Sequence, residues 1–371
     1  VSDRYTNEEA FAIKKMAETM GAKIFSMNNR ASGIADVLGF DASPNTIDEL
    51  LSTNMILAVG FNTTDNPVIE LKMKQAAEAG AKVVLVNPED YVQHIDFLNK
   101  AVYTKNDLSF LKEVAKAVVD SGRGAGVDGY EEFAASVKDV TVSDDAKAVA
   151  DMYLEAKKAM IVFNQNLITT EAASLLADIA LVSGHIGTPR DGILQVKAKN
   201  NSQGLVDLGI TAGAEELEGV KALVVFGEEA DIDTDALEFL AVSDTHMTAL
   251  AAKADVVIPG TGFASTDGTY TNTERRLQLV QAAIEEDVEL ANWEIAAEIA
   301  HVFEVDYEWE NTEDISVAMN DEVPAYKYAV VDEVLGGVLK PADDARLAVI
   351  GDAKFADPIK CTDSLMNVIV E

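Results

Sequence analysis

Residues 55–90 read MILAVGFNTTDNPVIELKMKQAAEAGAKVVLVNPED, and this stretch decides the fold. It opens on an uninterrupted apolar run, MILAV, and turns at Gly60-Phe61-Asn62. An amphipathic segment over residues 68–79 leads to a second apolar run over residues 82–86, which ends at Asn87-Pro88. Short apolar runs bounded by turn residues predict buried strands, and helical spacing predicts a helix between them. This order of elements predicts a parallel sheet flanked by helices.

A second stretch of the chain has the same plan. Residues 220–226 predict a strand that turns at Gly227-Glu228-Glu229, a helix precedes Leu240, and residues 239–243 predict a strand that ends at Asp244. Both stretches are Rossmann-like half units, in which the glycine after a strand lets backbone N–H groups approach a phosphate. Neither is a full G-x-G-x-x-G, so a plain tight turn is the alternative. Two copies favour a pair of nucleotide-sized crevices.

Helix and strand signals also occur outside these units. Thr6 and Glu9 predict a capping box at the start of a helix that ends at Gly21. Residues 121–130 predict a surface loop, and the tail after residue 306 predicts loops and a final short strand. The remaining predicted elements are a strand over residues 23–25, helices over residues 143–156 and 170–183, and a strand over residues 159–164.

Length, charge and cysteine content limit the classes of protein. A chain of 371 residues is longer than one hydrophobic core usually serves, which predicts two domains. With 64 acidic and 29 basic residues, its net charge of −35 excludes nucleic acid as a partner and favours a solvated surface or a basic partner subunit. Cys361 is the single cysteine, so no disulfide and no cysteine-bound iron–sulfur cluster can form within the chain. Without a long apolar run or a signal peptide, we expect a cytoplasmic protein with no direct membrane insertion, which partner subunits could hold at the inner face of a membrane.

Residues 251–303 carry motifs that resemble the molybdopterin oxidoreductase family. ADVVIP at 254–259, DGTYTNTERRLQ at 267–278 and NWEI at 292–295 match in order and spacing. Further matching stretches are YTNEEAFAIKKMA at 5–17, GFNTTDNPVI at 60–69, VNPED at 86–90, SGHIGTPRDGI at 183–193 and KNNSQGLVDLG at 199–209. The resemblance is strongest to formate dehydrogenase alpha subunits and to the large peripheral-arm subunit of NADH-quinone oxidoreductase, respiratory complex I.

The resemblance implies the fold class and the domain organisation. We expect an α/β protein of two Rossmann-like domains with mainly parallel sheets flanked by helices, similar to domains 1–3 of formate dehydrogenase and DMSO reductase. Residues 27–145 are expected to form one domain, inserted into a discontinuous second domain of residues 1–26 and 146–371. The resemblance also implies that the chain begins after a cysteine-rich cluster domain and stops before a β-barrel cap. The cofactor crevice would run between the two domains, at the carboxyl ends of both sheets.

For the site, the resemblance implies a molybdopterin guanine dinucleotide. Arg275 and Arg276 could fork onto pterin or phosphate oxygens, or they could pin their loop to the neighbouring domain through ion pairs with Glu274. Asp244 could accept from a guanine edge, or it is a turn residue. The other candidate cofactor-binding residues are the polar side chains of two loops and the two predicted glycine turns, for which loop self-bonding is the alternative: Asn200, Asn201, Gln203, Thr271 and Asn272, with Gly60, Asn62, Asn87 and Gly227.

Several positions depart from the family's pattern. At the metal-ligand region, Asn29-Arg30-Ala31-Ser32-Gly33, the arginine remains as Arg30, but Ser32 stands at the ligand position and Gly33 at the position of the neighbouring histidine. The histidines have no ligand spacing, so no metal site is assigned. Acidic, smaller or otherwise changed residues stand at further family positions: Asn87, Glu89, Lys197, Ala198, Glu228, Glu229 and Ser265. Two acidic side chains at 228 and 229 would repel the phosphates of a cofactor.

These departures leave alternative functions. The first is the core of a chain like the large peripheral-arm subunit of an NADH dehydrogenase, or of a related redox complex, without metal chemistry or cofactor of its own, that supports iron–sulfur or flavin electron-transfer subunits. The second is the cofactor-binding part of an active molybdenum or tungsten enzyme such as a formate dehydrogenase alpha subunit, in which Ser32 and Arg30 would lie at the metal. A nucleotide-binding protein outside redox chemistry would leave the ordered motifs unexplained.

Overall fold

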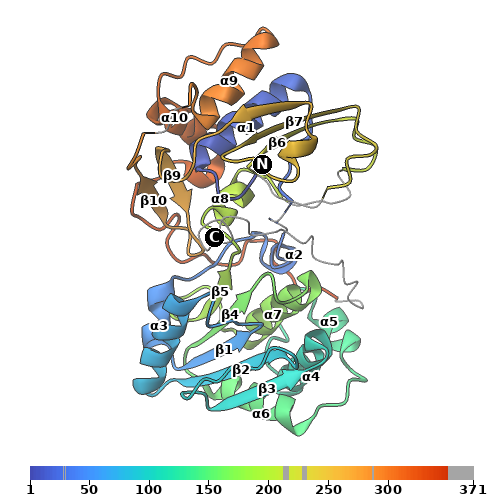
Figure 1. Ribbon diagram of the computed structural model, residues 1–371. Helices are drawn as coiled ribbons and strands as arrows, with labels where there is room; N and C mark the ends of the chain where they lie inside the picture. Colours follow the sequence, from blue (N-terminus) through green and yellow to red (C-terminus); the bar gives the residue numbers. More distant parts are fainter. Residues whose placement is uncertain (28, 30, 212–216, 228–231, 286–287, 350–371) are drawn as a thin grey trace.

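A computed structural model describes residues 1–27, 29, 31–211, 217–227, 232–285 and 288–349 of the chain. The chain forms two α/β units that lie one above the other in Figure 1. Blue, cyan and green elements make the lower, first unit, whereas gold and orange elements gather in the upper, second unit together with the N-terminal helix. The predicted α/β class with parallel sheets flanked by helices is therefore confirmed.

The first unit is built on a five-stranded sheet in the order β3-β2-β1-β4-β5, in which every pair is parallel. Its strands are β1 (Met55–Val59), β2 (Lys82–Pro88), β3 (Lys100–Thr104), β4 (Ala159–Asn164) and β5 (Gly192–Val196). Its helices are α2 (Ala35–Leu38), η1 (Ile47–Ser52), α3 (Pro67–Glu78), α4 (Asp107–Asp120), α5 (Tyr130–Ser136), α6 (Asp144–Glu155) and α7 (Thr170–Ser183).

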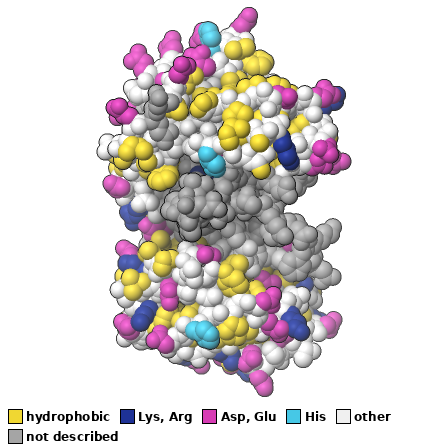
Figure 2. Space-filling view, viewed as in Figure 1, with side chains coloured by type: hydrophobic (Ala, Val, Ile, Leu, Met, Phe, Trp, Pro, Cys, Tyr) yellow, Lys and Arg dark blue, Asp and Glu magenta, His cyan; other side chains and the backbone are white. Residues whose placement is uncertain are grey.

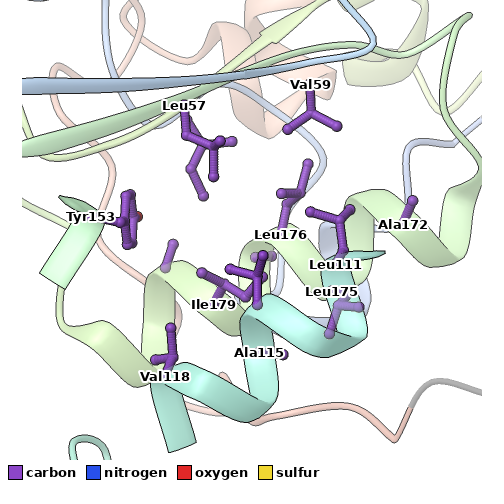
Figure 3. Close-up of a cluster of buried hydrophobic side chains, with 14 of the residues drawn as sticks. Leu57, Val59, Leu111, Ala115, Val118, Tyr153, Ala172, Leu175, Leu176 and Ile179 are labelled. Carbon is purple, nitrogen blue, oxygen red and sulfur yellow. The ribbon is translucent and has the colours of Figure 1, made fainter. Parts of the chain in front are cut away.

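The central strand β1 is apolar throughout because both faces of the sheet are covered. Leu57 and Val59 point into a core with α4 and α7, and Figure 3 shows them above side chains such as Leu176 and Leu111. Ile56 points into the opposite core with α3. An uninterrupted apolar run is therefore what this position in a parallel sheet requires.

The first sheet extends beyond the predicted domain boundary at residue 145. Strand β4 pairs with β1 and strand β5 pairs with β4, so both belong to the sheet that β1 begins. The physical reason is that β4 and β5 are buried strands that need a parallel neighbour, which the first sheet supplies. We propose that this unit runs from about residue 34 to residue 196, with the second unit built from the two flanking parts of the chain.

The second unit contains a three-stranded parallel sheet in the order β6-β7-β8 and an antiparallel pair, β9 and β10. Its strands are β6 (Ala222–Phe226), β7 (Phe239–Asp244), β8 (Val256–Pro259), β9 (Gly268–Thr271) and β10 (Leu277–Val280). Its helices are α1 (Asn7–Met20), α8 (Ser202–Asp207), η3 (Ala251–Lys253), α9 (Asn292–Val302), α10 (Thr312–Glu322) and η4 (Pro324–Tyr326). Helices α1 and α9 pack together beside the sheet.

Most predicted elements are confirmed, with three exceptions. Helix α1 has the predicted capping box, in which the Thr6 side chain accepts from the Glu9 N–H at 3.2 Å, and it ends at Gly21. The predicted strand over residues 23–25 is wrong, and residues 232–238 contain no helix before Leu240. The tail was predicted as loops and a final short strand, but it contains α10, and its described residues, 306–349, contain no strand. Glu228, Glu229 and Cys361 lie outside the described residues.

A C-terminal strap, residues 335–348, returns from the second unit across the first. Its backbone N–H groups at Leu339 and Ala342 donate to the carbonyls of Pro44 and Leu38, both at 3.0 Å. Leu347 is buried in the first unit's core with 2% of its surface exposed. The strap has no periodic pattern, which is why the sequence did not reveal it.

On the face that Figure 2 draws, the acidic side chains do not gather in a single patch. On the face drawn in Figure 2, acidic side chains are spread over both units, with basic ones between them. This distribution is typical of a solvated surface. No helix in the described part of the chain combines the length and the apolar content needed to cross a membrane.

Asp178 on α7 predicts a pH dependence of stability. The side chain is fully buried, one carboxyl oxygen accepts from the Ala348 N–H of the strap at 2.9 Å, and burial raises its pKa to about 8. Between about pH 4 and pH 8 the unfolded chain ionises this group while the folded chain keeps it protonated, so stability falls as pH rises. We expect Asp178→Asn to remove this loss, at up to about 1.4 kcal/mol per pH unit.

Urea unfolding at pH 5, 7 and 9 measures this effect as the difference in unfolding free energy between the Asp178→Asn variant and the natural chain. That difference should grow with pH and level off above about pH 8. Asp139→Asn at an exposed position is the matched control, and its difference should stay flat. A flat difference for Asp178→Asn as well would contradict the raised pKa.

Candidate functional site

The buried polar groups between the two units include Ser32, which the sequence resemblance places at the family's metal-ligand position. The Ser32 Oγ donates to Asp41 Oδ1 at 2.7 Å, and the Ser32 backbone N–H donates to Asp41 Oδ2 at 2.8 Å. Lys197 follows the end of β5, and its Nζ donates to Asp41 Oδ1 at 3.2 Å. The side chains of Lys197 and Asp41 are 1% and 9% exposed. Ser32, Asp41 and Lys197, here called the Ser-Asp-Lys cluster, form one connected group.

Charges within the Ser-Asp-Lys cluster support each other. Burial opposes ionisation of Asp41, but the charge of Lys197 and the Ser32 hydrogen bonds outweigh it and hold the pKa of Asp41 below its usual value. Burial lowers the pKa of Lys197, and the charge of Asp41 counteracts that effect. The pKa of Asp41 is lowered because Ser32 donates two hydrogen bonds to the carboxylate and Lys197 donates a third. Asp41 and Lys197 therefore form a buried ion pair.

Helix α8 continues this polar network into the second unit. The Gln203 Nε2 donates to the Asp41 carbonyl at 3.1 Å and to Asp207 Oδ1 at 2.9 Å. Burial raises the pKa of Asp207 to about 6, against the effects of Gln203 and Lys197. Asp41 was missed in the sequence because it is a lone acidic residue outside a motif, and Asp207, although it lies within the matching stretch at 199–209, was not singled out. Lys197 was noted only as a departure from the family.

The polar groups of the amide-rich and threonine-rich loops bind to other protein groups. The Thr271 backbone N–H donates to Asn201 Oδ1 at 2.9 Å, and Asn201 Nδ2 donates to the Tyr5 carbonyl at 2.8 Å. Both side chains are fully buried, whereas Asn200 is exposed. Asn272 Oδ1 accepts from the backbone N–H of Arg276 at 2.9 Å. Asn272 bonds within its own loop, as expected for loop self-bonding, whereas Asn201 and Thr271 bond to groups that are distant in sequence.

The two arginines of the loop face different partners. Arg275 is 4% exposed, and its guanidinium donates to four backbone carbonyls: those of Ser43, Pro44, Leu335 and Gly337. Arg276 donates to Glu274 at 2.8 Å, and Glu274 in turn accepts from the Ile47 N–H of the first unit at 2.7 Å. These contacts favour the alternative in which the loop is pinned to the neighbouring unit.

The first glycine turn is closed by its own side chains. Gly60 has φ of 59°, and a Cβ there would lie 2.5 Å from the Ile168 side chain. Asn87 accepts from the Phe61 N–H at 2.8 Å and donates to the Phe61 carbonyl at 2.9 Å. Asn62 donates to Asp65 and to the Tyr91 hydroxyl, both at 2.6 Å. These contacts support a plain tight turn at Gly60.

The second glycine turn differs, because unpartnered hydroxyls lie along the carboxyl edge of its sheet. A Cβ at Gly227 would lie 2.7 Å from the Tyr5 ring, so Tyr5 packs on this turn. Asp244 Oδ1 accepts from the Thr245 N–H at 2.7 Å, as a turn residue does. Beside it, Ser243 Oγ and Thr261 Oγ1 are buried without a hydrogen-bond partner among the described residues. Unpartnered buried hydroxyls are a feature that a polar ligand could satisfy.

Gly33 stands where the resemblance places the family's histidine, and its surroundings leave no space for a side chain. Gly33 has φ of +93°, and a Cβ there would lie 2.4 Å from the Thr170 carbonyl oxygen. The Ser174 Oγ donates to the Gly33 carbonyl at 2.7 Å, which holds the turn against α7. A histidine therefore cannot replace Gly33 without moving the backbone. Arg30 lies outside the described residues.

Two parallel-sheet α/β units joined through buried polar groups define the class of protein. The profile of the molybdopterin oxidoreductase family matches residues 1–302, so this chain belongs to that family. The resemblance found in the sequence is thereby confirmed.

Formate dehydrogenases are among the curated relatives of this chain. The chain is 24% identical to the F420-dependent formate dehydrogenase subunit alpha of Methanocaldococcus jannaschii, over 88% of this chain and 60% of that protein. It is 23% identical to formate dehydrogenase H of Escherichia coli, over 84% of this chain and 54% of that protein. The chain thus spans slightly more than half of these relatives. They favour the formate dehydrogenase alternative over the NADH dehydrogenase one.

Solved structures confirm the fold. Acetylene hydratase from Pelobacter acetylenicus has a TM-score of 0.61 at 13% identity, over 91% of this chain and 59% of that chain. A chain of the formyltransferase/hydrolase complex FhcABCD from Methylorubrum extorquens, solved with methylofuran, has a TM-score of 0.57 at 14% identity, over 81% and 89%.

The described residues at the expected metal-ligand position do not fit a metal centre. Ser32 Oγ already donates to Asp41, and it accepts from the Ile34 N–H at 3.3 Å. A deprotonated serine ligand would stand beside the ionised Asp41 carboxylate, which like charges disfavour. Among the described residues, no three His, Cys, Asp or Glu side chains are grouped closely enough to hold a metal ion. The hydroxyls beside β7 fit a polar ligand better than the metal-ligand position fits a metal.

Proposed function

We propose that this chain is the two-unit core of a formate dehydrogenase alpha-type subunit in a multi-subunit complex that handles formate or formyl groups. In that complex it supports partner subunits that carry iron–sulfur or flavin groups, and it performs no metal chemistry itself. The fold neighbour from a formyltransferase/hydrolase complex, which this chain covers over 89% of its length, supports a role of such a core within an assembly.

A single observation carries the proposal. Arg275 lies in the loop that matches the family, and its guanidinium is fully engaged in hydrogen bonds that join the two units. Four backbone carbonyls on both sides of the interface accept from it. A cofactor that used this arginine would have to break those contacts at a cost of buried, unsatisfied carbonyls. The loop therefore serves the assembly of the two units.

A second candidate function is a cofactor-binding part of an active molybdenum or tungsten enzyme. The formate dehydrogenase relatives favour it, and so do the buried hydroxyls of Ser243 and Thr261, which have no partner among the described residues. In this alternative, those hydroxyls and Asp244 would contact the nucleotide end of the cofactor.

Metal and pterin content of the full-length parent protein separates the two. The parent is purified with its partner subunits from cells supplied with molybdate and tungstate, and a metal-loaded formate dehydrogenase is carried through the same steps as a control. We expect molybdenum, tungsten and acid-released oxidised pterin well below one per chain. Stoichiometric metal and pterin would establish the second candidate instead.

A further inference from the structure

The Ser-Asp-Lys cluster contains Ser32, which the sequence resemblance places at the family's metal-ligand position. Three segments that are distant in sequence supply it: the Ser32 turn, the segment after α2, and the end of β5. The Lys197 side chain is 1% exposed, and a lysine this deeply buried is rare unless it is paired. The cluster thus has a specific architecture and is not a chance surface contact.

Both atoms that could reach a ligand are directed at Asp41. The Ser32 hydroxyl donates at 2.7 Å, the Lys197 ammonium donates at 3.2 Å, and both contacts fall on the same oxygen, Oδ1. The other oxygen accepts from the Ser32 N–H at 2.8 Å. The carboxylate therefore has a positive partner and two serine donors, which is the satisfied state that a buried carboxylate needs.

The charge balance points the same way. A bound metal ion would place positive charge between the two units, and removing it would leave the polar groups around it without a counter-charge. In this chain Lys197 supplies one positive charge from within, opposite Asp41 and close to Asp207 on α8. With this internal cation, the buried carboxylates at the interface have a counter-charge without a bound metal ion.

We propose that the Lys197–Asp41 ion pair, with Ser32 bound to it, replaces the family's metal centre as the charged link that closes the interface between the two units. This inference rests on the proposed role without metal chemistry. It adds that the position where the resemblance expects the metal stabilises the interface between the two units in this chain.

A double-mutant cycle on the 371-residue chain tests it, with thermal unfolding as the readout. Lys197→Met leaves the Asp41 carboxylate buried without its cation, and Asp41→Asn leaves the ammonium without its anion. We expect each single change to lower the Tm by about 5–10 °C, since each leaves one buried charge uncompensated. In the double variant neither member of the pair is left without its partner, so its Tm should fall by less than that of either single variant.

The exposed Lys221–Glu238 pair is the matched control, with side chains 73% and 68% exposed at 2.6 Å. Lys221→Met, Glu238→Gln and their combination should each change the Tm by about 1 °C or less. Additive losses in the Lys197–Asp41 cycle, or single losses as small as those of the control, would overturn the inference.

The cycle and the metal analysis of the parent fail in different ways. If the parent protein contains no metal and the Tm losses of the two single variants add up in the double variant, only the ion-pair inference is overturned. If the parent contains stoichiometric metal and the Tm losses are strongly non-additive, the proposed function without metal chemistry is overturned. The ion pair then lies beside the metal and does not replace it.

Discussion

Arg275→Met is expected to destabilise the folded chain by about 3–5 kcal/mol, because it leaves several backbone carbonyls at the interface without donors. The guanidinium is 4% exposed and binds carbonyls of residues 43, 44, 335 and 337, so its loss affects the first unit, the loop and the strap together. Chemical denaturation with intrinsic fluorescence measures the loss, and protection of the strap amides from hydrogen exchange should fall with it.

Its neighbour provides the matched control. Arg276 lies in the same loop, its side chain is 34% exposed, and it forms an ion pair with Glu274 at 2.8 Å. We expect Arg276→Met to cost about 1 kcal/mol or less, as partly exposed pairs do. Arg275→Lys should lie closer to Arg275→Met than to the natural chain, since an ammonium cannot serve carbonyls in the planar fork geometry. Equal losses for Arg275→Met and Arg276→Met would contradict the assigned role of Arg275.

The sequence predicted the elements whose pattern is local. The apolar run MILAV at 55–59 predicted a strand covered on both faces. The spacing of Thr6 and Glu9 predicted the start of α1. Both were confirmed because their signals depend on neighbouring residues. The family, too, could be recognised because its motifs are short and ordered.

Long-range contacts decided what the sequence did not predict. Strands β4 and β5 have the same apolar character whichever sheet they join, so the boundary at residue 145 could not be drawn from pattern. The partners of Arg275 are backbone carbonyls, and because every residue has one, the sequence does not indicate which of them bind the guanidinium. For the same reason, Asp41 could not be recognised: its importance comes from Lys197, which is distant in the chain and adjacent only in the fold.

Gly33→Ala is expected to cost about 3 kcal/mol or more, because strain and collision add at this position. Its φ of +93° is unfavourable for a residue with a Cβ, and the added atom would lie 2.4 Å from the Thr170 backbone oxygen and 2.5 Å from Ser174 Oγ. A backbone oxygen at the start of a buried helix cannot move as the end of a flexible side chain can. The turn that carries Ser32 would therefore lift from α7, and the Ser174 hydrogen bond to the Gly33 carbonyl would be lost.

Gly80→Ala separates strain from collision. Gly80 has a similar φ of +100°, but nothing lies within 4 Å of its added Cβ, so we expect a cost of about 1–2 kcal/mol from backbone strain alone. The excess loss in Gly33→Ala, measured by urea unfolding of both variants, is the cost of crowding the turn against α7. If the two variants lose the same stability, the turn has room for a side chain, and the steric reason for the missing histidine falls with it.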